Sequence, residues 1–257
     1  MAGVCLWMEA NPLSPSLDLA RALVAGVGGA ALQDRLMKVL IEPLLSAEQC
    51  ELLVQALGSP EAIWRPGQDS AGWHARAVKH NQQLDGGSAL YQRLAAQIEA
   101  AMRDHPLVQA TAFPRRIHTI LFSRCGVGEG YGRHVDNAWM AAGRSDLSFT
   151  LALSDPDHYG GGALVLESPS GEEAFRLPAG HALLYPSSLL HRVEPVSQGQ
   201  RLVAVGWIES RIRQPDQREL LFELDTARRA LFERSGKDEV FDLISRSYSN
   251  LLRRWDS

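Results

Sequence analysis

The pattern of apolar and polar residues divides the chain into helical and strand-like regions, and the first helical region begins near Met37. Ser46 and Gln49 form a capping box, which predicts the start of a helix, and Gly58 predicts its end. Between them one helical face is apolar, formed by Leu52, Leu53, Ala56 and Leu57. A second helix is expected over residues 88–104, after the turn sequence DGGS.

From Arg116 onwards the apolar period changes to two, which is typical of strands. The alternation occurs in eight short segments: IHTILFS, YGRHVD, DLSFTLALS, GALVLE, AFRLP, HALLYP, LHRVEPV and RLVAVGWIES. Short strands in this number predict a β-sandwich or a barrel. In DLSFTLALS the face with Leu147, Phe149, Leu151 and Leu153 predicts a core face. The opposite face, with Ser148, Thr150 and Ala152, is free to line a cavity.

The helical period returns after Gln214 and predicts two C-terminal helices, the first starting at Pro215 and ending at Gly236. The second helix carries a broad apolar stripe, formed by Val240, Phe241, Ile244, Tyr248, Leu251, Leu252 and Trp255. This stripe requires burial against the sheet, the partner helix or another subunit, so a homo-oligomer through these helices is one expectation.

The predicted fold is therefore mostly β with flanking helices. We expect residues 1–36 to form a poorly structured extension, because they are rich in small residues and lack a sustained amphipathic pattern. Residues 37–213 are expected to form the β domain with its N-terminal helices, and residues 214–257 a C-terminal helical subdomain.

Composition narrows the choice of partners. With 257 residues, 45% of them hydrophobic, the chain is long enough for a full core. A net charge of −4 without a basic run predicts no nucleic-acid or membrane partner, because both require clustered lysine and arginine. The apolar stretch ALVAGVGGAAL is too short to span a bilayer. Three separated cysteines, Cys5, Cys50 and Cys125, form no disulfide framework and suit a cytoplasmic protein.

The segment GYGRHVDNAW places His134 and Asp136 two positions apart, after a glycine-rich turn. On a strand these two side chains share a face and can converge on one metal ion. His191, in YPSSLLHRVEPV, is the candidate third ligand from a different strand. Two histidines and one carboxylate form the facial triad of non-haem Fe(II) oxygenases, and zinc hydrolases use the same ligand types.

Arg201, ten positions after His191, favours the oxygenase. The alternation in RLVAVGW puts it on the same face as Val203, Val205 and Trp207. A guanidinium on such an apolar face requires an opposite charge with hydrogen bonds. A dicarboxylic acid supplies that charge, because arginine binds a carboxylate in a bidentate fork.

The ordered set His134, Asp136, His191 and Arg201 resembles the Fe(II)/2-oxoglutarate-dependent dioxygenase superfamily, in its prolyl-hydroxylase branch. A closer similarity is to the bacterial PKHD-type hydroxylases. It is carried by VKHNQQL, GYGRHVD, LALSDPDHYGGGALVL, LPAGHALLYPSSLLHRVEPV, WIESRIR, LLFELD and NLLRRW. The likeness runs from about Met37 to Trp255 and leaves out the opening segment.

This resemblance implies a double-stranded β-helix, a kind of jelly roll, as the core. It implies that His134, Asp136 and His191 are the catalytic iron ligands and that Arg201 binds the distal carboxylate of 2-oxoglutarate. The implied reaction uses O2 to hydroxylate a small molecule or a peptide or protein side chain, and releases succinate and CO2. Ascorbate is implied as the reductant that keeps the iron as Fe(II).

One position departs from the pattern of such enzymes, which tend to carry a tyrosine near the end of the segment ILFSRC. This chain has Cys125 there, which leaves the second contact to the carboxylate of 2-oxoglutarate open. Tyr131, three residues before His134, is a candidate substitute or a contact to the substrate.

The sequence leaves alternatives open for the function class, for the role of residues 79–83 and for the substrate. A cupin-like metal-binding or sensing module without turnover fits the same ligands, and a halogenase of the same superfamily is disfavoured by the carboxylate of Asp136. The segment KHNQQ (79–83) either forms a lip of the substrate cleft or satisfies buried backbone polar groups. Prolyl residues, a siderophore-like metabolite and other acceptors all stay open as substrates.

Overall fold

The computed structural model describes residues 38–73 and 75–257, so the extension predicted over residues 1–36 lies outside the described residues. The described chain belongs to two compact units, one ending at Arg211 and the other formed by residues 212–257. The domain boundaries expected from the sequence stay a prediction.

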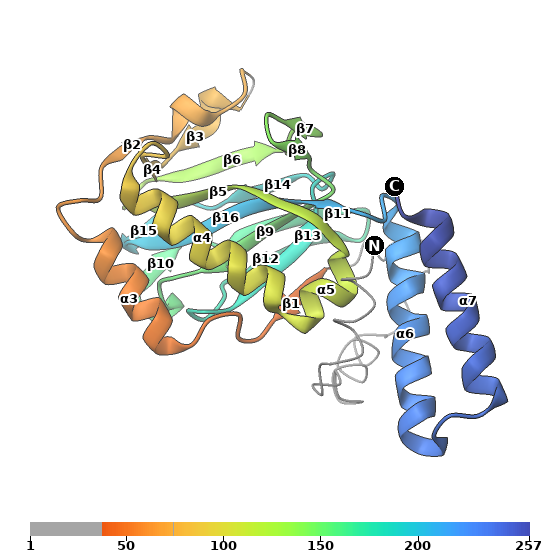
Figure 1. Cartoon of the computed structure of the whole chain (residues 1–257). Helices are drawn as coiled ribbons and strands as arrows, with labels where there is room; N and C mark the ends of the chain where they lie inside the picture. Colours follow the sequence, from red (N-terminus) through yellow and green to blue (C-terminus); the bar gives the residue numbers. More distant parts are fainter. Residues whose placement is uncertain (1–37, 74) are drawn as a thin grey trace. The chain divides into compact units, whose positions relative to one another are not determined.

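The first unit contains two antiparallel sheets (Figure 1). The larger sheet has the order β1 (Val39–Ile41), β13 (Ala182–Pro186), β9 (Leu147–Ala152), β16 (Arg201–Ser210), β5 (Pro114–Cys125), β4 (Gln82–Leu84) and β2 (Trp64–Pro66). The smaller sheet has the order β12 (Gly171–Phe175), β11 (Leu164–Ser168), β14 (His191–Val193), β6 (Gly130–His134) and β3 (Lys79–His80). Two short pairs join β7 (Trp139–Met140) to β8 (Gly143–Arg144) and β10 (Tyr159–Gly161) to β15 (Val196–Gly199).

The chain crosses repeatedly between the two sheets. Strands β5, β9, β13 and β16 lie in the larger sheet, and β6, β11, β12 and β14 lie in the smaller one. Eight antiparallel strands divided in this way between two sheets form a jelly roll, here a double-stranded β-helix. The predicted fold class, mostly β with flanking helices, is confirmed.

Two strand predictions are wrong in their bounds. The strand expected at AFRLP lies earlier, at β12, because the chain turns at Pro178, whose carbonyl accepts a hydrogen bond from the His181 N–H. The segment LHRVEPV divides into β14 and β15, which belong to different sheets. Pro195 stands between them and has no N–H to donate to a strand ladder.

The N-terminal helices follow their predicted signals. Helix α3 (Ala47–Leu57) starts with the Ser46–Gln49 capping box and ends at Gly58, and α4 (Ala89–Asp104) follows Ser88. A further short helix, α5 (Pro106–Ala112), was not predicted. The remaining short helical turns are η2 (Gly67–Ser70), η3 (Arg76–Val78) and η4 (Pro156–His158).

Helix α4 covers one face of the larger sheet. The hydroxyl of Tyr91 donates to the carbonyl of Ile120 on β5 at 2.8 Å, and the Tyr91 and Phe122 rings meet edge to face. Because side chains alternate along a strand, Ser123 and Cys125 of β5 point the other way, between the sheets.

The second unit is the predicted helical hairpin of α6 (Pro215–Ser235) and α7 (Glu239–Trp255), with Gly236 at φ +69° after the first helix. The rings of Phe232 and Phe241 lie 5.2 Å apart between the helices. Part of the predicted apolar stripe is buried, as at Tyr248, whereas Val240 is 55% exposed.

Candidate active site

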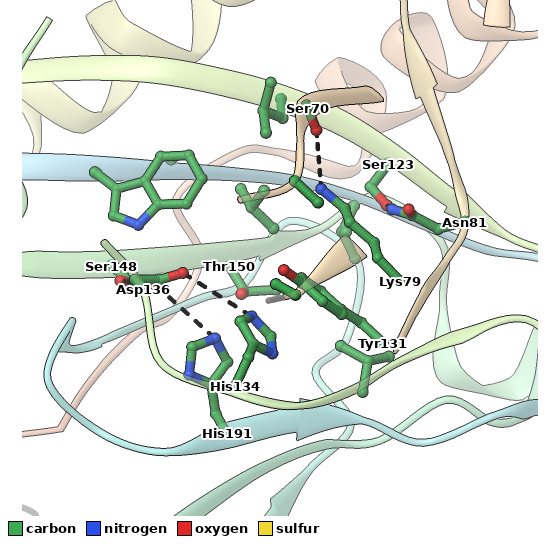
Figure 2. A pocket seen from close by; sticks show the side chains of 18 of the residues that line it. Ser70, Lys79, Asn81, Ser123, Tyr131, His134, Asp136, Ser148, Thr150 and His191 are labelled. Atoms are coloured by element: carbon green, nitrogen blue, oxygen red, sulfur yellow. Dashed lines mark hydrogen bonds and ion pairs between the residues drawn. The ribbon is translucent and has the colours of Figure 1, made fainter. Parts of the chain in front are cut away.

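A cavity of about 200 Å³ lies between the two sheets and is lined by both (Figure 2). The larger sheet contributes Thr119, Leu121, Ser123, Cys125, Ser148, Thr150, Arg201, Val203, Val205 and Trp207. The smaller sheet and the segment that follows β6 contribute Lys79, Tyr131, His134, Asp136, Leu164, His191 and Val193. The side of β9 with Ser148 and Thr150 therefore lines a cavity, and Arg201 shares its face with Val203, Val205 and Trp207, both as predicted.

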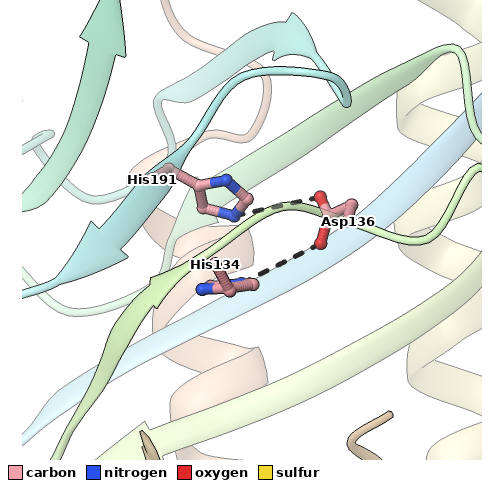
Figure 3. A group of neighbouring side chains, drawn as sticks. All are labelled: His134, Asp136 and His191. Atoms are coloured by element: carbon pink, nitrogen blue, oxygen red, sulfur yellow. Dashed lines mark ion pairs between the residues drawn. The ribbon is translucent and has the colours of Figure 1, made fainter. Parts of the chain in front are cut away.

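The structure brings His134, Asp136 and His191 together in this cavity (Figure 3). His134 and His191 are directly opposite partners on the paired strands β6 and β14, with ring centroids 4.2 Å apart. The two Asp136 carboxylate oxygens lie 4.0 Å from His134 Nε2 and 3.9 Å from His191 Nε2. One donor atom from each residue lies within 4.8 Å of the other two, which makes this group the metal-binding candidate among the described residues.

Hydrogen bonds from the backbone fix the tautomer of both rings. Nδ1 of His134 lies 2.8 Å from the carbonyl oxygen of Gly132, and Nδ1 of His191 lies 3.0 Å from that of Leu189. A carbonyl only accepts, so each Nδ1 carries the proton and each Nε2 presents a lone pair toward Asp136. Burial and the neighbouring His191 lower the pKa of His134, which keeps it neutral, the form that binds metal.

Ser148 holds the Asp136 carboxylate in place. Its hydroxyl donates to Asp136 Oδ2 at 2.6 Å and lies 2.8 Å from the hydroxyl of Ser187, and both serines are buried. Partners of this kind orient the groups that bind a metal and are typical of metal sites. The sequence suggested only that Ser148 faces a cavity, because its bond to Asp136 depends on the approach of two strands.

We expect Ser148→Ala to weaken Fe(II) binding by about 10- to 100-fold, the usual effect of losing an outer hydrogen bond to a metal ligand. The measurement is Fe(II) titration of wild type and variant under anaerobic conditions. Ser154→Ala is the matched control, since Ser154 lies just beyond β9 and bonds only to the backbone of Leu202. Equal Fe(II) affinity in Ser148→Ala and wild type would contradict this role.

Arg201 is the first residue of β16 and stands opposite Cys125, the last residue of β5. Its side chain lines the cavity and is buried, with 6% of the residue exposed. In the part of the chain that the structure describes, no carboxylate lies within ion-pair distance of its guanidinium. A buried charge without a partner is costly, so this arrangement indicates an anion supplied from outside the chain.

The two positions left open by the sequence also lie in the cavity wall. Cys125 is a buried free thiol, and burial raises its pKa, so it is neutral and a weak donor at neutral pH. Tyr131 stacks on His134 with ring centroids 3.6 Å apart, and burial raises the pKa of Tyr131 to about 12. The phenol is therefore a protonated donor beside a candidate metal ligand.

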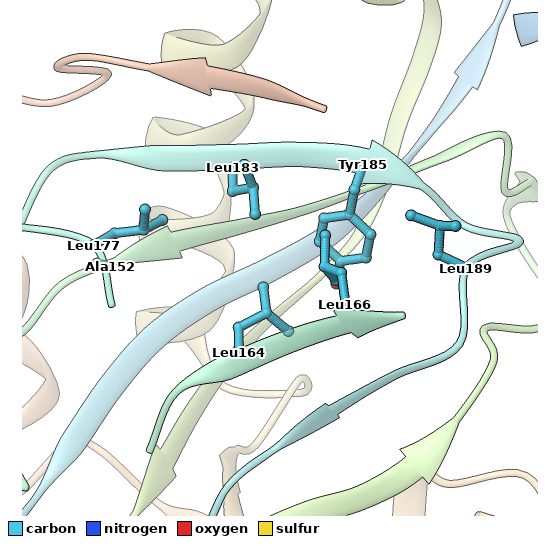
Figure 4. Packing of buried hydrophobic residues seen from close by; sticks show 7 residues of the cluster. All are labelled: Ala152, Leu164, Leu166, Leu177, Leu183, Tyr185 and Leu189. Carbon is cyan, nitrogen blue, oxygen red and sulfur yellow. The ribbon is translucent and has the colours of Figure 1, made fainter. Parts of the chain in front are cut away.

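A hydrophobic cluster closes the space between the sheets next to this site (Figure 4). It consists of Ala152, Leu164, Leu166, Leu177, Leu183, Tyr185 and Leu189, with Phe175 and Val193 packed against it. The rings of Tyr185 and His191 meet edge to face at 5.4 Å. Through Tyr185 the cluster thus supports the His191 ring from one side.

Sequence comparison agrees with this geometry. Residues 120–209 match the 2OG-Fe(II) oxygenase superfamily, and residues 216–256 match the PKHD-type hydroxylase C-terminal domain. A PKHD-type hydroxylase from Synechococcus elongatus is 54% identical over 223 residues, which cover 85% of this chain and 99% of the relative. Another, from Acaryochloris marina, is 49% identical over 219 residues, covering 85% of this chain and 99% of the relative.

Among solved structures, a Pseudomonas putida prolyl-4-hydroxylase is 22% identical, with a TM-score of 0.48, and the match covers 68% of this chain and 92% of that one.

The matches to the 2OG-Fe(II) oxygenase superfamily and to PKHD-type hydroxylases define the chain as an Fe(II)- and 2-oxoglutarate-dependent oxygenase. Within that class it belongs to the PKHD-type hydroxylase family. It is therefore a 2-oxoglutarate-dependent dioxygenase that uses Fe(II), 2-oxoglutarate and O2 to hydroxylate a substrate. In the described part of the chain, no helix combines the length and apolar character needed to cross a bilayer.

Proposed function

We propose that His134, Asp136 and His191 hold the catalytic Fe(II) of this hydroxylase and that Arg201 binds the distal carboxylate of 2-oxoglutarate. The observation that carries the proposal is one cavity lined by the His134, Asp136 and His191 group and by a buried arginine with no carboxylate in ion-pair distance among the described residues. Alternation and spacing in the sequence offered the same four residues as candidates, and the resemblance to the dioxygenase superfamily implied these roles.

The donor set fits Fe(II). Two imidazole nitrogens and one carboxylate oxygen on one side of an ion form the facial arrangement that leaves other positions open. Both imidazoles are held by backbone carbonyls and the carboxylate by a serine hydroxyl, so the ligands are oriented before the ion arrives. When bound, the iron supplies the centre at which O2 oxidises 2-oxoglutarate to succinate and CO2 and the substrate C–H bond is hydroxylated.

Arg201 would select the co-substrate and fix its direction. Its guanidinium presents parallel N–H groups that match a carboxylate, in a wall otherwise formed by Val203, Val205 and Trp207. The Trp207 indole N–H is buried and has no hydrogen-bond partner among the described residues, so it is available to a bound molecule. The burial of Arg201 and Trp207 strengthens these interactions, because a buried hydrogen bond is stronger than one in water.

The proposal also covers the reductant, the substrate class, the location and the partners of the enzyme. We propose ascorbate as the reductant, a small-molecule or peptide substrate, and a cytoplasmic location, which the free thiols of Cys50 and Cys125 support. A net charge of −4 supports action without a nucleic-acid or membrane partner.

The exposed apolar residues Val240 and Leu243 of α7 favour a homo-oligomer, which the molar mass from light scattering would test.

The function is tested by anaerobic titration with Fe(II), followed by 2-oxoglutarate and then air. We expect one Fe(II) per chain, a weak visible absorption when the keto acid chelates it, and succinate release that requires both. Dependence on ascorbate is read as slower inactivation over repeated turnovers. A protein that holds only zinc and releases no succinate would contradict the proposal.

A further inference from the structure

A second buried cation lines the cavity and has no role in the site proposed above. Lys79, the first residue of β3, is 5% exposed. Its ammonium donates to the hydroxyl of Ser70 at 3.0 Å and lies 5.2 Å from the centre of the Tyr131 ring. Among the residues that the structure describes, no carboxylate lies within ion-pair distance of it. Burial lowers the pKa of Lys79 to about 8, against an opposite effect of the Asp136 carboxylate, so at neutral pH the positive charge is retained.

Strand positions separate this cation from Arg201. The Ser70 hydroxyl that accepts from Lys79 itself donates to Gln83 on β4. Strand β5 lies between β4 and β16, which carries Arg201. Lys79 itself belongs to β3 of the smaller sheet, so the two cations enter the cavity from different sheets. Lys79 is thus a second cavity-lining cation, carried by a different strand and sheet from Arg201.

The balance of charges in the cavity indicates that a further anion binds there. The charged residues that line the cavity are Lys79, Arg201 and Asp136, so its walls carry one net positive charge, because imidazoles that bind a metal are neutral. Fe(II) adds two positive charges and the 2-oxoglutarate dianion adds two negative charges. One positive charge therefore remains after both have bound, in a cavity where an unpaired charge is costly.

We propose that Lys79 binds a carboxylate of the acceptor molecule, so that the substrate of this hydroxylase is a small carboxylic acid. The inference rests on the proposed Fe(II) and 2-oxoglutarate site. Tyr131 contacts both His134 and Lys79 and lies between them in Figure 2. An acceptor held at Lys79 therefore has its carboxylate one aromatic ring away from a metal ligand and its hydrocarbon part free to reach the metal. A cavity of about 200 Å³ suits a small acceptor.

The test uses the full chain loaded with Mn(II), which does not turn over, and saturated with 2-oxoglutarate. The probes are isovalerate and its neutral amide, isovaleramide, and the readout is broadening of their methyl proton signals by the bound Mn(II). We expect the wild type to broaden isovalerate strongly and isovaleramide weakly. Lys79→Met should lose the difference between the probes, and Lys79→Arg should keep it because the charge remains. Lys237→Met, which changes an exposed lysine, is the matched control.

Two further measurements separate this role from others. The Kd for 2-oxoglutarate should change less than about twofold in Lys79→Met, well under the tenfold that corresponds to 1.4 kcal/mol. The melting temperature without ligands should rise, because methionine removes a buried unpaired charge without leaving a void. A lysine that merely supported the Ser70 loop would give a lower melting temperature on replacement.

Several results would overturn the proposal. Equal broadening of the acid and the amide by the wild type would remove the carboxylate site. Loss of 2-oxoglutarate affinity in Lys79→Met would assign the lysine to the co-substrate, and a lower melting temperature would assign it a structural role. Failure of the wild type to take up Mn(II) would instead overturn the proposed metal site, and with it this inference.

Discussion

Replacing Arg201 by alanine is expected to weaken 2-oxoglutarate binding by about 30-fold to several-thousand-fold, with Fe(II) affinity close to that of the wild type. This range corresponds to the roughly 2 to 5 kcal/mol lost when one partner of a buried, hydrogen-bonded charge pair is removed. Fe(II) affinity is preserved because the His134, Asp136 and His191 donor atoms and their hydrogen-bond partners are untouched. The measurement is titration of Fe(II) and then of 2-oxoglutarate, with succinate release in parallel.

Two variants make this result specific. Arg201→Lys should recover only part of the affinity, since lysine keeps the charge but loses the fork. Arg192→Ala is the matched control, because Arg192 follows His191 on β14 but pairs with Glu172 and does not line the cavity. The rise in melting temperature caused by 2-oxoglutarate should disappear in Arg201→Ala and persist in Arg192→Ala. Normal binding of 2-oxoglutarate by Arg201→Ala would remove this arginine from the site.

Much of the fold could be predicted because local patterns determine it. The capping box at Ser46, the turn at Gly236 and the alternation in β9 and β16 each depend on residues close together in sequence. Strand bounds failed where a proline or a turn interrupts an alternating segment, as at β12 and between β14 and β15. Helix α5 and strands β1 to β4 were missed because two to seven residues are too few to show a period.

The candidate site was partly visible in the sequence for a similar reason. His134 and Asp136 are two positions apart in the sequence, at and just beyond the end of β6, and the face of β16 identifies Arg201. That His191 stands directly opposite His134 depends on strand register, which no local pattern encodes. The Ser148–Asp136 bond and the burial of Lys79 arise from contacts between segments far apart in the chain. The sequence offered KHNQQ as either a cleft lip or a structural segment, and the structure puts Lys79, Asn81 and Gln83 in the cavity wall.

Loss of the Asp136 carboxylate is expected to give the opposite pattern from loss of Arg201. Asp136 supplies the anionic ligand, and without it two neutral imidazoles and the Ser148 hydroxyl face the ion. Fe(II) affinity in Asp136→Ala should therefore fall by more than the roughly 10- to 100-fold expected for an outer hydrogen bond, and succinate release should fall to background. Arg201 is unchanged, so the weak binding of 2-oxoglutarate measured with a chelator present should equal that of the wild type.

Asp136→Asn makes the test sharper, because it keeps the size of the side chain and an oxygen that accepts from Ser148, but removes the charge and turns the other oxygen into an NH2 donor. If the carboxylate binds the metal as proposed, Asp136→Asn should lose Fe(II) nearly as severely as Asp136→Ala, while melting temperatures stay close to the wild type. Asp157→Ala, at an exposed aspartate in η4, is the matched control and should bind Fe(II) normally. One Fe(II) bound per chain with wild-type affinity in Asp136→Asn and Asp136→Ala would show that the metal is held elsewhere than between the two histidines and this carboxylate.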